Sequence, residues 1–357
     1  MKKIKIGDIL EIQPKSKVKA GEGITNGKYP FYTCSNELTK SVNTADYEGD
    51  ALIMGTGGMA SIHYEKGKFS TSTDCLVYKS NKNVNLSLIN KYLRTNIYLL
   101  ENGFKGAGLR HISRDYISNI TIPLPERNLQ DKIVKELDLI EKTIANHTDV
   151  LKKYDTLIKS RFIEMFGDPA TNPKKWEIKI LDEVCKKITD GKHGGCKVED
   201  NSDYYYVGAR EIFDLNIHYE TAQEITKEDF EKDYKRCNLE IGDFCIVNTG
   251  ATIGKTAIAK DVRTTKTLLQ KSVALLKTKE NLLSALYLQY SYITNPSMYK
   301  VENASAQPNL LLSKIRETKI MLPPLFLQND FAAFVQQIDK SKFEMEKIVR
   351  LCYTILM

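Results

Sequence analysis

Two segments of the chain carry apolar side chains in a heptad pattern. In the first, positions step alternately by four and three residues and form the stripe Ile133, Leu137, Ile140, Ile144, His147, Leu151, Tyr154 and Ile158. In the second, the same register holds Phe331, Val335, Ile338, Lys342, Met345, Val349, Cys352 and Leu356. Such spacing keeps one stripe facing a partner helix. We therefore predict two long helices, 126–167 and 323–357, packed on each other as an antiparallel coiled coil.

One polar residue interrupts each stripe, His147 in the first and Lys342 in the second. A polar residue in a helix seam costs stability but can fix the register of the pair. We interpret His147 as a seam residue near water rather than as a ligand. Prolines precede both helices and should stop the preceding strand: Pro123 and Pro125, then Pro323 and Pro324.

A mixed segment lies before each helix. Its strand-like runs are ALIMG, DCLVYK and NITIPL in the first segment and YYYVGA, DFCIV and SVALLK in the second, with helix-like runs at 86–101 and 282–293. The stretch FGDPATNPKKW (166–176) is rich in Gly, Pro and Asn and marks a boundary. The sequence predicts an α+β protein with two mixed α/β domains, 1–125 and 168–322. Residues Tyr204–Tyr206 fit a strand core better than a base-stacking platform.

The two halves are an internal repeat. ISNITIPLPERNLQDKIVKELDLIEK (117–142) matches IRETKIMLPPLFLQNDFAAFVQQIDK (315–340), which pairs Ile122 with Ile320 and Gln130 with Gln328. Two shorter blocks match as well: EGDALIMGTG (48–57) with IGDFCIVNTG (241–250), and IKIGDIL (4–10) with IKILDEV (178–184). We therefore expect both domains to share one fold, with longer loops in the second.

The stretch NTGATIGKT (248–256) nearly spells a phosphate-binding loop. That loop requires four residues between its glycines and a helix after it, but here three residues separate Gly250 from Gly254 and a strand-like run follows. The matching stretch of the first copy, GTGGMASIHY, has no Gly-Lys pair. These features favour a strand–turn–strand unit over an ATPase.

Composition and charge limit the kind of partner and the cellular compartment that we expect for this chain. Its 357 residues are 42% hydrophobic and 27% charged, with a net charge of +7, which permits an anionic partner. There are seven cysteines but no C-x-x-C pair, so neither a zinc site nor a disulfide framework is expected. Neither a signal peptide nor an apolar run near 18 residues is evident, so we expect a cytoplasmic protein with no membrane partner.

Several motifs resemble the specificity subunit of type I restriction–modification enzymes, HsdS. ITIPLPERNLQDKIV and IMLPPLFLQNDFAAFV are similar to that family's I-P-L-P-P-x-x-x-Q entry into its spacer helices. GAGLRHISRDYISNI, ASAQPNLLLSKIRET and FGDPATNPKKWEIKILDEV resemble neighbouring segments, and ITDGKHGG (188–195) and GATIGKTAIA resemble two of its turns. The resemblance covers essentially the whole chain. The first copy departs from it, because GITNGKYPFYTCSN stands where D-G-x-H is expected.

The resemblance implies a non-catalytic subunit that reads a bipartite, asymmetric site on double-stranded DNA. Two methyltransferase subunits would supply S-adenosylmethionine and adenine chemistry, and restriction/translocase subunits would supply ATP and Mg; no cofactor or metal is expected on this chain. Absent motifs agree: the nearest match to the adenine methyltransferase loop, NPSM (295–298), fails at two positions. A bidentate protein–protein adaptor with the same two domains is the alternative.

Ten residues are candidate DNA contacts, because Lys and Arg bind phosphates and polar side chains read base edges. They are Lys66, Lys68, Lys105, Arg110 and His111 in the first domain, and Lys192, His193, Arg210, Lys255 and Arg263 in the second. Each lysine is equally compatible with a solvated surface charge. His111 aligns with Asn309 in the repeat, so a shared structural role is also open.

Overall fold

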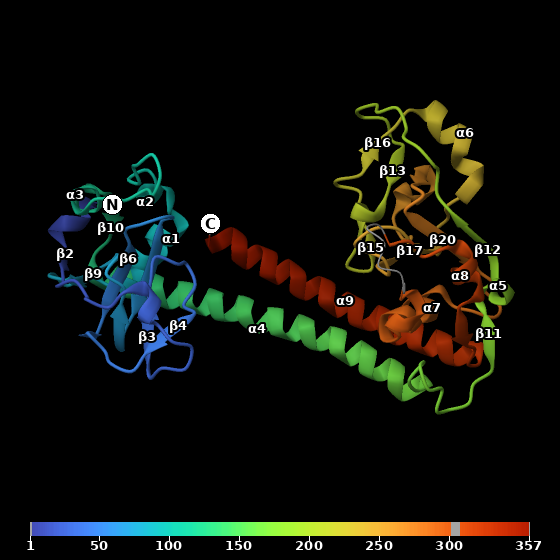
Figure 1. Ribbon diagram of the computed structural model, residues 1–357, viewed down its shortest axis with the longest axis horizontal. Coiled ribbons are helices and arrows are strands. Elements are labelled where there is room, and N and C mark those ends of the chain that lie inside the picture. Colours follow the sequence, from blue (N-terminus) through green and yellow to red (C-terminus); the bar gives the residue numbers. More distant parts are fainter. Residues whose placement is uncertain (1, 301–307, 357) are drawn as a thin grey trace. The chain divides into compact units, whose positions relative to one another are not determined.

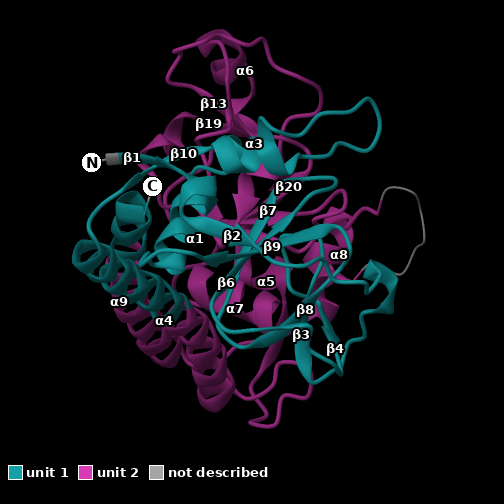
Figure 2. Ribbon diagram, turned by 90° about the vertical axis from the view of Figure 1, so that its left-hand side faces the viewer, with its two compact units in different colours: residues 1–148, 347–357 teal, residues 149–346 magenta. Residues whose placement is uncertain are grey.

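The computed structural model describes residues 2–300 and 308–356, and the start of the ASAQPNL motif lies outside this range. The chain divides into two compact units (Figure 2): unit 1 comprises residues 1–148 and 347–357, and unit 2 comprises residues 149–346. Both units combine sheets with helices. In the part of the chain that is described, no helix is long and apolar enough to cross a membrane.

Unit 1 contains two four-stranded sheets, ordered β2-β9-β6-β7 and β4-β3-β8-β5, and a separate β1–β10 pair. Its strands are β1 (Lys2–Lys5), β2 (Leu10–Ile12), β3 (Tyr29–Tyr32), β4 (Lys40–Val42), β5 (Tyr47–Glu48), β6 (Ala51–Gly55), β7 (Ser61–Glu65), β8 (Lys68–Thr71), β9 (Cys75–Ser80) and β10 (Thr121–Leu124). Its shorter helices are α1 (Leu86–Thr95), α2 (Tyr98–Glu101) and α3 (Arg114–Asn119).

Strand β6 is the centre of unit 1 because both of its faces are covered. Leu52 and Met54 point into the cluster that includes residues of α1 and α3, and Ile53 points into a second cluster around Phe69 of β8. All five residues of β6 are buried. A strand covered on both faces reads as a continuous apolar run, which is why ALIMG shows no alternation.

Unit 2 repeats this plan with the sheet β12-β20-β17-β18 and a smaller sheet, β16-β13-β19. Its strands are β11 (Ile178–Ile180), β12 (Cys185–Asp190), β13 (Tyr205–Val207), β14 (Ile212–Phe213), β15 (Asn216–Ile217), β16 (Gln223–Glu224), β17 (Phe244–Val247), β18 (Thr256–Ile258), β19 (Thr267–Leu269), β20 (Val273–Thr278) and β21 (Lys319–Met321). Its shorter helices are α5 (Leu181–Val184), α6 (Lys227–Cys237), α7 (Ala285–Thr294) and α8 (Leu312–Glu317). Tyr206 is buried in β13, as the strand-core interpretation requires, whereas Tyr204 precedes the strand and both Tyr204 and Tyr205 are only partly buried.

The structure confirms the internal repeat. The four-stranded sheets of the two units share one strand order, and the parallel β3–β8 pair of unit 1 recurs as β13–β19 in unit 2. The β1–β10 pair likewise recurs as β11–β21. Each pair joins the start of a unit to the strand that leads into its long helix.

Two of the sequence matches are wrong by one residue. The Gly58 N–H donates to the Arg110 carbonyl at 3.0 Å, and the Gly250 N–H donates to the Pro308 carbonyl at 3.1 Å, so Gly58 rather than Gly57 matches Gly250. Near the start of each unit, Ile6 matches the equally buried Leu181 rather than Ile180. Register in a covered sheet is set by which face each side chain occupies, and the alignment was shifted by identical residues, which lie in flanking turns of the first pair of blocks and in strands β1 and β11 of the second.

The two long helices are α4 (Arg127–Phe166) and α9 (Leu325–Leu356) (Figure 1). Within unit 2 they pack antiparallel: the ring centroids of Phe162 and Phe331 are 5.4 Å apart, while the Lys342 amine lies 2.6 Å from the Asp155 carboxylate. Every position of both predicted stripes is buried or partly buried, as the heptad pattern predicts. Lys342 is thus neutralised within the seam.

His147 is partly buried, and its Nδ1 lies 2.8 Å from the Thr143 carbonyl of the same helix. This position agrees with a seam residue. No group of three or more His, Cys, Asp and Glu suited to a metal occurs among the residues that the structure describes.

A buried glutamine fastens the start of each long helix. The Gln328 carbonyl oxygen accepts the Ser284 N–H at 2.9 Å, and its amide donates to the carbonyls of Leu282 and Pro323 at 3.0 and 2.8 Å. Gln130 accepts the Asn85 N–H and donates to the Pro125 carbonyl, both at 2.8 Å. The repeated Pro-to-Gln spacing therefore ties the long helix to the start of α7 in unit 2 and of α1 in unit 1.

Gln328→Ala should lower the free energy of unfolding of unit 2 by about 3 kcal/mol, because it leaves the buried Pro323 carbonyl and the partly buried Ser284 N–H and Leu282 carbonyl without their partner. Urea denaturation measures this change. Gln336→Ala, at an exposed position of the same helix, is the matched control and should stay within about 0.5 kcal/mol of the parent. Equal effects of both substitutions would show that the buried hydrogen bonds of Gln328 contribute nothing.

Candidate nucleic-acid interface

In unit 2, five loops meet where β12 and β17 end and β18 and β20 begin. We call residues 190–194, 208–210, 248–255, 270–272 and 308–310 the loop edge of unit 2. Backbone hydrogen bonds join these loops: Lys192 N–H to the Leu269 carbonyl (2.7 Å), Lys271 N–H to the Lys192 carbonyl (3.0 Å), Asn248 N–H to the Ser272 carbonyl (3.0 Å) and Gly250 N–H to the Pro308 carbonyl (3.1 Å). Segments distant in sequence therefore form one surface.

The D-G-x-H turn at this edge has a fixed shape. A Cβ on Gly191 would lie 2.0 Å from the Leu269 carbonyl oxygen, so only glycine allows this close approach of two backbones. The guanidinium of Arg236, on α6, donates to the Gly191 carbonyl at 2.8 Å and forms an ion pair with Asp190. The Tyr206 hydroxyl donates to the Gly194 carbonyl at 2.5 Å. The turn is thus held by α6 and β13.

Lys192 and His193 occupy this turn but differ in exposure and in ion pairing. The Lys192 amine lies 2.6 Å from the Asp233 carboxylate, its side chain is 13% exposed, and the hydrogen bond to Asp233 raises its pKa. The His193 side chain is largely exposed, with Nε2 3.2 Å from Asp190. Both stay predicted DNA contacts. A phosphate would have to compete with Asp233 for Lys192, whereas His193 faces solvent.

The turn 250–255 joins β17 to β18, which confirms the strand–turn–strand interpretation. The Gly254 N–H donates to the Val247 carbonyl at 3.0 Å, and the backbone angle φ is +100° at Gly250 and +90° at Gly254, values that favour glycine. Residues Thr256–Ile258 form a strand, so the helix that a phosphate-binding loop requires does not follow the turn. Lys255 is exposed at the start of that strand.

The two predicted arginines of unit 2 lie at opposite ends of the fold. Arg210 is exposed in the short η3 helix (Ala209–Glu211) at the loop edge. Arg263 lies in η4 (Val262–Lys266), beyond the far end of β18. Its guanidinium is 2.7 Å from the Asp261 carboxylate and 4.4 Å from the centroid of the Tyr219 ring. The structure thus brings Lys192, His193, Arg210 and Lys255 together and leaves Arg263 apart, already engaged.

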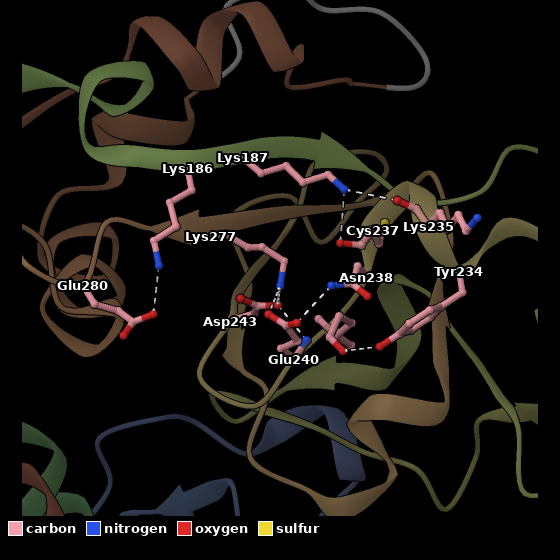
Figure 3. A network of polar contacts seen from close by, with 11 residues as sticks. Lys186, Lys187, Tyr234, Lys235, Cys237, Asn238, Glu240, Asp243, Lys277 and Glu280 are labelled. Atoms are coloured by element: carbon pink, nitrogen blue, oxygen red, sulfur yellow. Dashed lines mark hydrogen bonds and ion pairs between the residues drawn. The ribbon is translucent and has the colours of Figure 1, made fainter. Parts of the chain in front are cut away.

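Lys277 and Lys186, at the opposite end of the same sheet, are neutralised by carboxylates (Figure 3). The Lys277 amine lies 2.7 Å from the carboxylates of both Asp243 and Glu240, and Lys186 lies 3.1 Å from Glu280. The Lys187 amine points toward backbone carbonyls of α6. Lys277 and Lys186 would therefore have to leave a carboxylate before either could bind an anionic ligand.

The loop edge of unit 2 retains its positive charge. Arg210, Lys255 and Lys271 are all exposed there, and none has a carboxylate partner within residues 2–300 and 308–356. Lys271, on the turn between β19 and β20, is absent from the sequence prediction. Its place in a short turn between two strand-like runs is the signal that could have found it.

Unit 1 has an equivalent loop edge, formed by residues 13–19, 33–38, 56–60, 72–74 and 105–112. The Thr56 N–H donates to the Asp74 carbonyl at 2.8 Å, the Thr73 N–H to the Val18 carbonyl at 3.0 Å and the Ile112 N–H to the Thr56 carbonyl at 3.1 Å. The predicted residues Lys105, Arg110 and His111 lie here and are exposed. Lys15 and Lys17, which the sequence prediction omits, are exposed at the same edge.

Lys66 and Lys68 lie elsewhere in unit 1. They flank the β7–β8 turn next to the start of β6, which is the end of the sheet away from the loop edge. The Lys68 amine is 3.7 Å from the Glu48 carboxylate, and the Lys66 amine lies over the Tyr64 ring. The structure therefore separates these two lysines from Lys105, Arg110 and His111, and all five stay predictions.

His111 also has a structural role that its counterpart shares. Its backbone pairs with Gly57 and with Lys105, and Asn309 pairs with Thr249 in the corresponding place of unit 2. Gly57 and Thr249 are equivalent once the register is corrected. The main-chain part of the alignment between His111 and Asn309 is therefore confirmed, and the His111 side chain is exposed beside Gly57.

Gly191→Ala should destabilise unit 2 by about 3 kcal/mol, because the added methyl group overlaps the backbone at Leu269. Thermal denaturation measures the change. Gly195→Ala is the control within the same loop, since a Cβ there meets nothing within 4 Å. If Gly191→Ala unfolds at the parent temperature, the turn has an alternative geometry that tolerates a side chain.

Two copies of one mixed domain, each leading into a long helix and each presenting a cationic loop edge, define a duplicated binding scaffold. The model of the type I restriction modification DNA specificity domain matches residues 1–153 and 173–351. The chain belongs to this family.

Relatives and solved structures agree with this assignment. A Mycoplasma pneumoniae protein named as a type I specificity subunit is 27% identical, over 57% of each chain. The MjaVIII specificity subunit of Methanocaldococcus jannaschii is 25% identical, over 99% of this chain and 91% of that one. The chain thus spans little more than half of the first relative's length. A crystal structure of a type I S subunit from M. genitalium shares the fold, with a TM-score of 0.67 at 13% identity, covering 99% of this chain and 93% of that one.

Proposed function

We propose that this chain is the DNA sequence-specificity subunit of a type I restriction–modification complex. It reads a bipartite, asymmetric target, one half-site with each unit, and has no catalytic activity of its own. Membership of the specificity family supports this function. The structural observation that carries it is the duplicated loop edge, where exposed cations such as Arg210, Lys255 and Arg110 have no carboxylate partner among the described residues.

The chemistry of the two edges suits duplex DNA. Exposed Lys and Arg side chains bind phosphates and set the position of a protein on the duplex. Polar and apolar side chains on the same surface can then read base edges in the major groove, where all four base pairs differ. The two edges share a backbone plan but carry different side chains, so the two half-sites should have different sequences.

The partners follow from the same proposal. Two methyltransferase subunits would bring S-adenosylmethionine and the adenine chemistry, and restriction/translocase subunits would bring ATP hydrolysis with Mg. No cofactor is assigned to this chain. We also propose a cytoplasmic location, where such a complex would meet its DNA. One similar solved chain, with a TM-score of 0.55 at 16% identity and covering 99% of this chain and 97% of that one, comes from a study of complex assembly in the type I R-M system.

A bidentate protein–protein adaptor is the alternative that the sequence left open. Nothing in the family assignment supports it. The two functions differ in their response to salt, because DNA binding releases counterions and weakens steeply as salt rises.

The purified chain should transfer no methyl groups to DNA when mixed with S-adenosylmethionine. Together with its methyltransferase subunits, it should direct methylation to one interrupted, non-palindromic site. Methylome sequencing of cells that express the subunits together identifies the site. Methylation at a single continuous palindrome, or robust transfer by the isolated chain, would contradict the proposal.

Lys255→Ala and Arg210→Ala should each weaken binding to all duplexes and reduce the slope of log affinity against log salt by about one unit. Each substitution removes one cation from the loop edge of unit 2. Fluorescence anisotropy across a salt series measures the slope. Lys186→Ala removes a cation from the neutralised end of the same sheet and should leave the slope unchanged. A slope that falls equally in all three variants would show that the loop edge is not the DNA-facing surface.

A further inference from the structure

Three large apolar side chains of the loop edge of unit 1 are exposed, and two of them contact little of the protein. Met59 is 72% exposed and Leu109 is 81% exposed. Neither belongs to the hydrophobic clusters of unit 1. Their exposure therefore does not serve the packing of the domain.

The two side chains come from neighbouring turns. Met59 follows Gly58, and Leu109 precedes Arg110, and the Gly58 N–H donates to the Arg110 carbonyl at 3.0 Å. A second hydrogen bond between the same two turns joins the Ile112 N–H to the Thr56 carbonyl at 3.1 Å. A backbone ladder thus holds both turns together, so Met59 and Leu109 project from one continuous surface.

The charged residues around Met59 and Leu109 favour an anionic partner. Five exposed cations belong to the same edge, namely Lys15, Lys17, Lys19, Lys105 and Arg110, against the exposed carboxylates Glu37 and Asp74. A partner that attracts the cations and also accepts two apolar side chains must present both negative charge and apolar groups. The major groove of DNA does so, because the thymine C5-methyl is its apolar feature and the phosphates line its rims.

We propose that Met59 and Leu109 contact thymine C5-methyl groups in the major groove, so that the half-site read by unit 1 contains at least one thymine that the protein recognises by its methyl group. This inference rests on the proposed function and adds the chemistry of one half-site to it. In unit 2 the position that matches Met59 is held by Ala251, which is too short to supply an equivalent contact. Recognition by this pair is thus confined to one half-site.

Deoxyuridine tests the proposal directly, because it keeps every hydrogen-bonding group of thymine and lacks only the methyl. The complex of this chain with its methyltransferase subunits is titrated with duplexes of its methylome-defined site, in which each thymine is replaced in turn. At one or more positions of a single half-site, deoxyuridine should weaken binding about fourfold, the value for one buried methyl-sized group. Deoxyuridine replacements in the other half-site should not produce a loss of binding that depends on Met59 or Leu109.

Met59→Ala and Leu109→Ala show which side chains read the methyl group. Each residue is exposed, so neither substitution should alter folding. If the side chain contacts the methyl, the variant should bind the thymine and deoxyuridine duplexes almost equally, which is the coupling that a double-mutant cycle measures. Val262→Ala is the control: Val262 is as exposed, at 84%, but lies at the far end of unit 2, and it should keep the fourfold difference.

Two outcomes overturn the inference and leave the proposed function standing. One is bipartite methylation with no thymine sensitive to deoxyuridine in either half-site. The other is a loss of affinity in Met59→Ala or Leu109→Ala that is equal for thymine and deoxyuridine duplexes, since this would assign the pair to sugar contacts or to a partner subunit. Absence of any salt-dependent DNA binding by the complex is a different result, and it would remove the proposed function itself.

Discussion

Burial of β6 and β17 on both faces is the constraint on which each unit depends. Phe244 and Ile246 of β17 point into one cluster, while Cys245 and Val247 point into another. A sheet covered on both sides leaves only its two ends for recognition. The loops at those ends can therefore differ between the two units without disturbing the strand that organises them.

Charge separates the two ends of the sheet in unit 2. At one end Lys277 is shielded from solvent and shared between Asp243 and Glu240, and burial raises the pKa of Asp243 despite its ion pair. An ion pair of this kind cannot release its lysine to a phosphate without leaving the buried carboxylate of Asp243 unpaired. At the other end Arg210, Lys255 and Lys271 have no such tie among the described residues. The same sheet thus has lysines paired with carboxylates at one end, whereas the cations at the other end are available to an anionic ligand.

The sequence predicted the repeat, the two heptad helices and the turn after β17, because each depends on local periodicity or local chain geometry. It could not predict the partner of Lys192, because Asp233 reaches it from α6 only after the chain has folded. It also grouped Lys66 and Lys68 with Lys105. Which end of a sheet a residue occupies depends on how the strands pair, and that pairing could not be predicted from the sequence. The one-residue errors in register have the same origin, because identical residues in two segments do not determine which face of the sheet a side chain occupies.

Substitutions cost more stability at buried positions than at exposed ones, and this difference explains how one scaffold can bind two different half-sites. Gln130 and Gln328 are buried, and each satisfies main-chain groups that no other described side chain reaches, so replacing either one leaves polar groups unpaired in the interior. Met59 and Ala251 occupy equivalent turns, differ by most of a side chain, and both lie in solvent. Substitution at such a position costs little stability. The free energy available for discriminating bases is therefore decoupled from the free energy that holds the domain together, so a loop edge can change what it reads while the helices, the sheets and the glutamine contacts stay as they are.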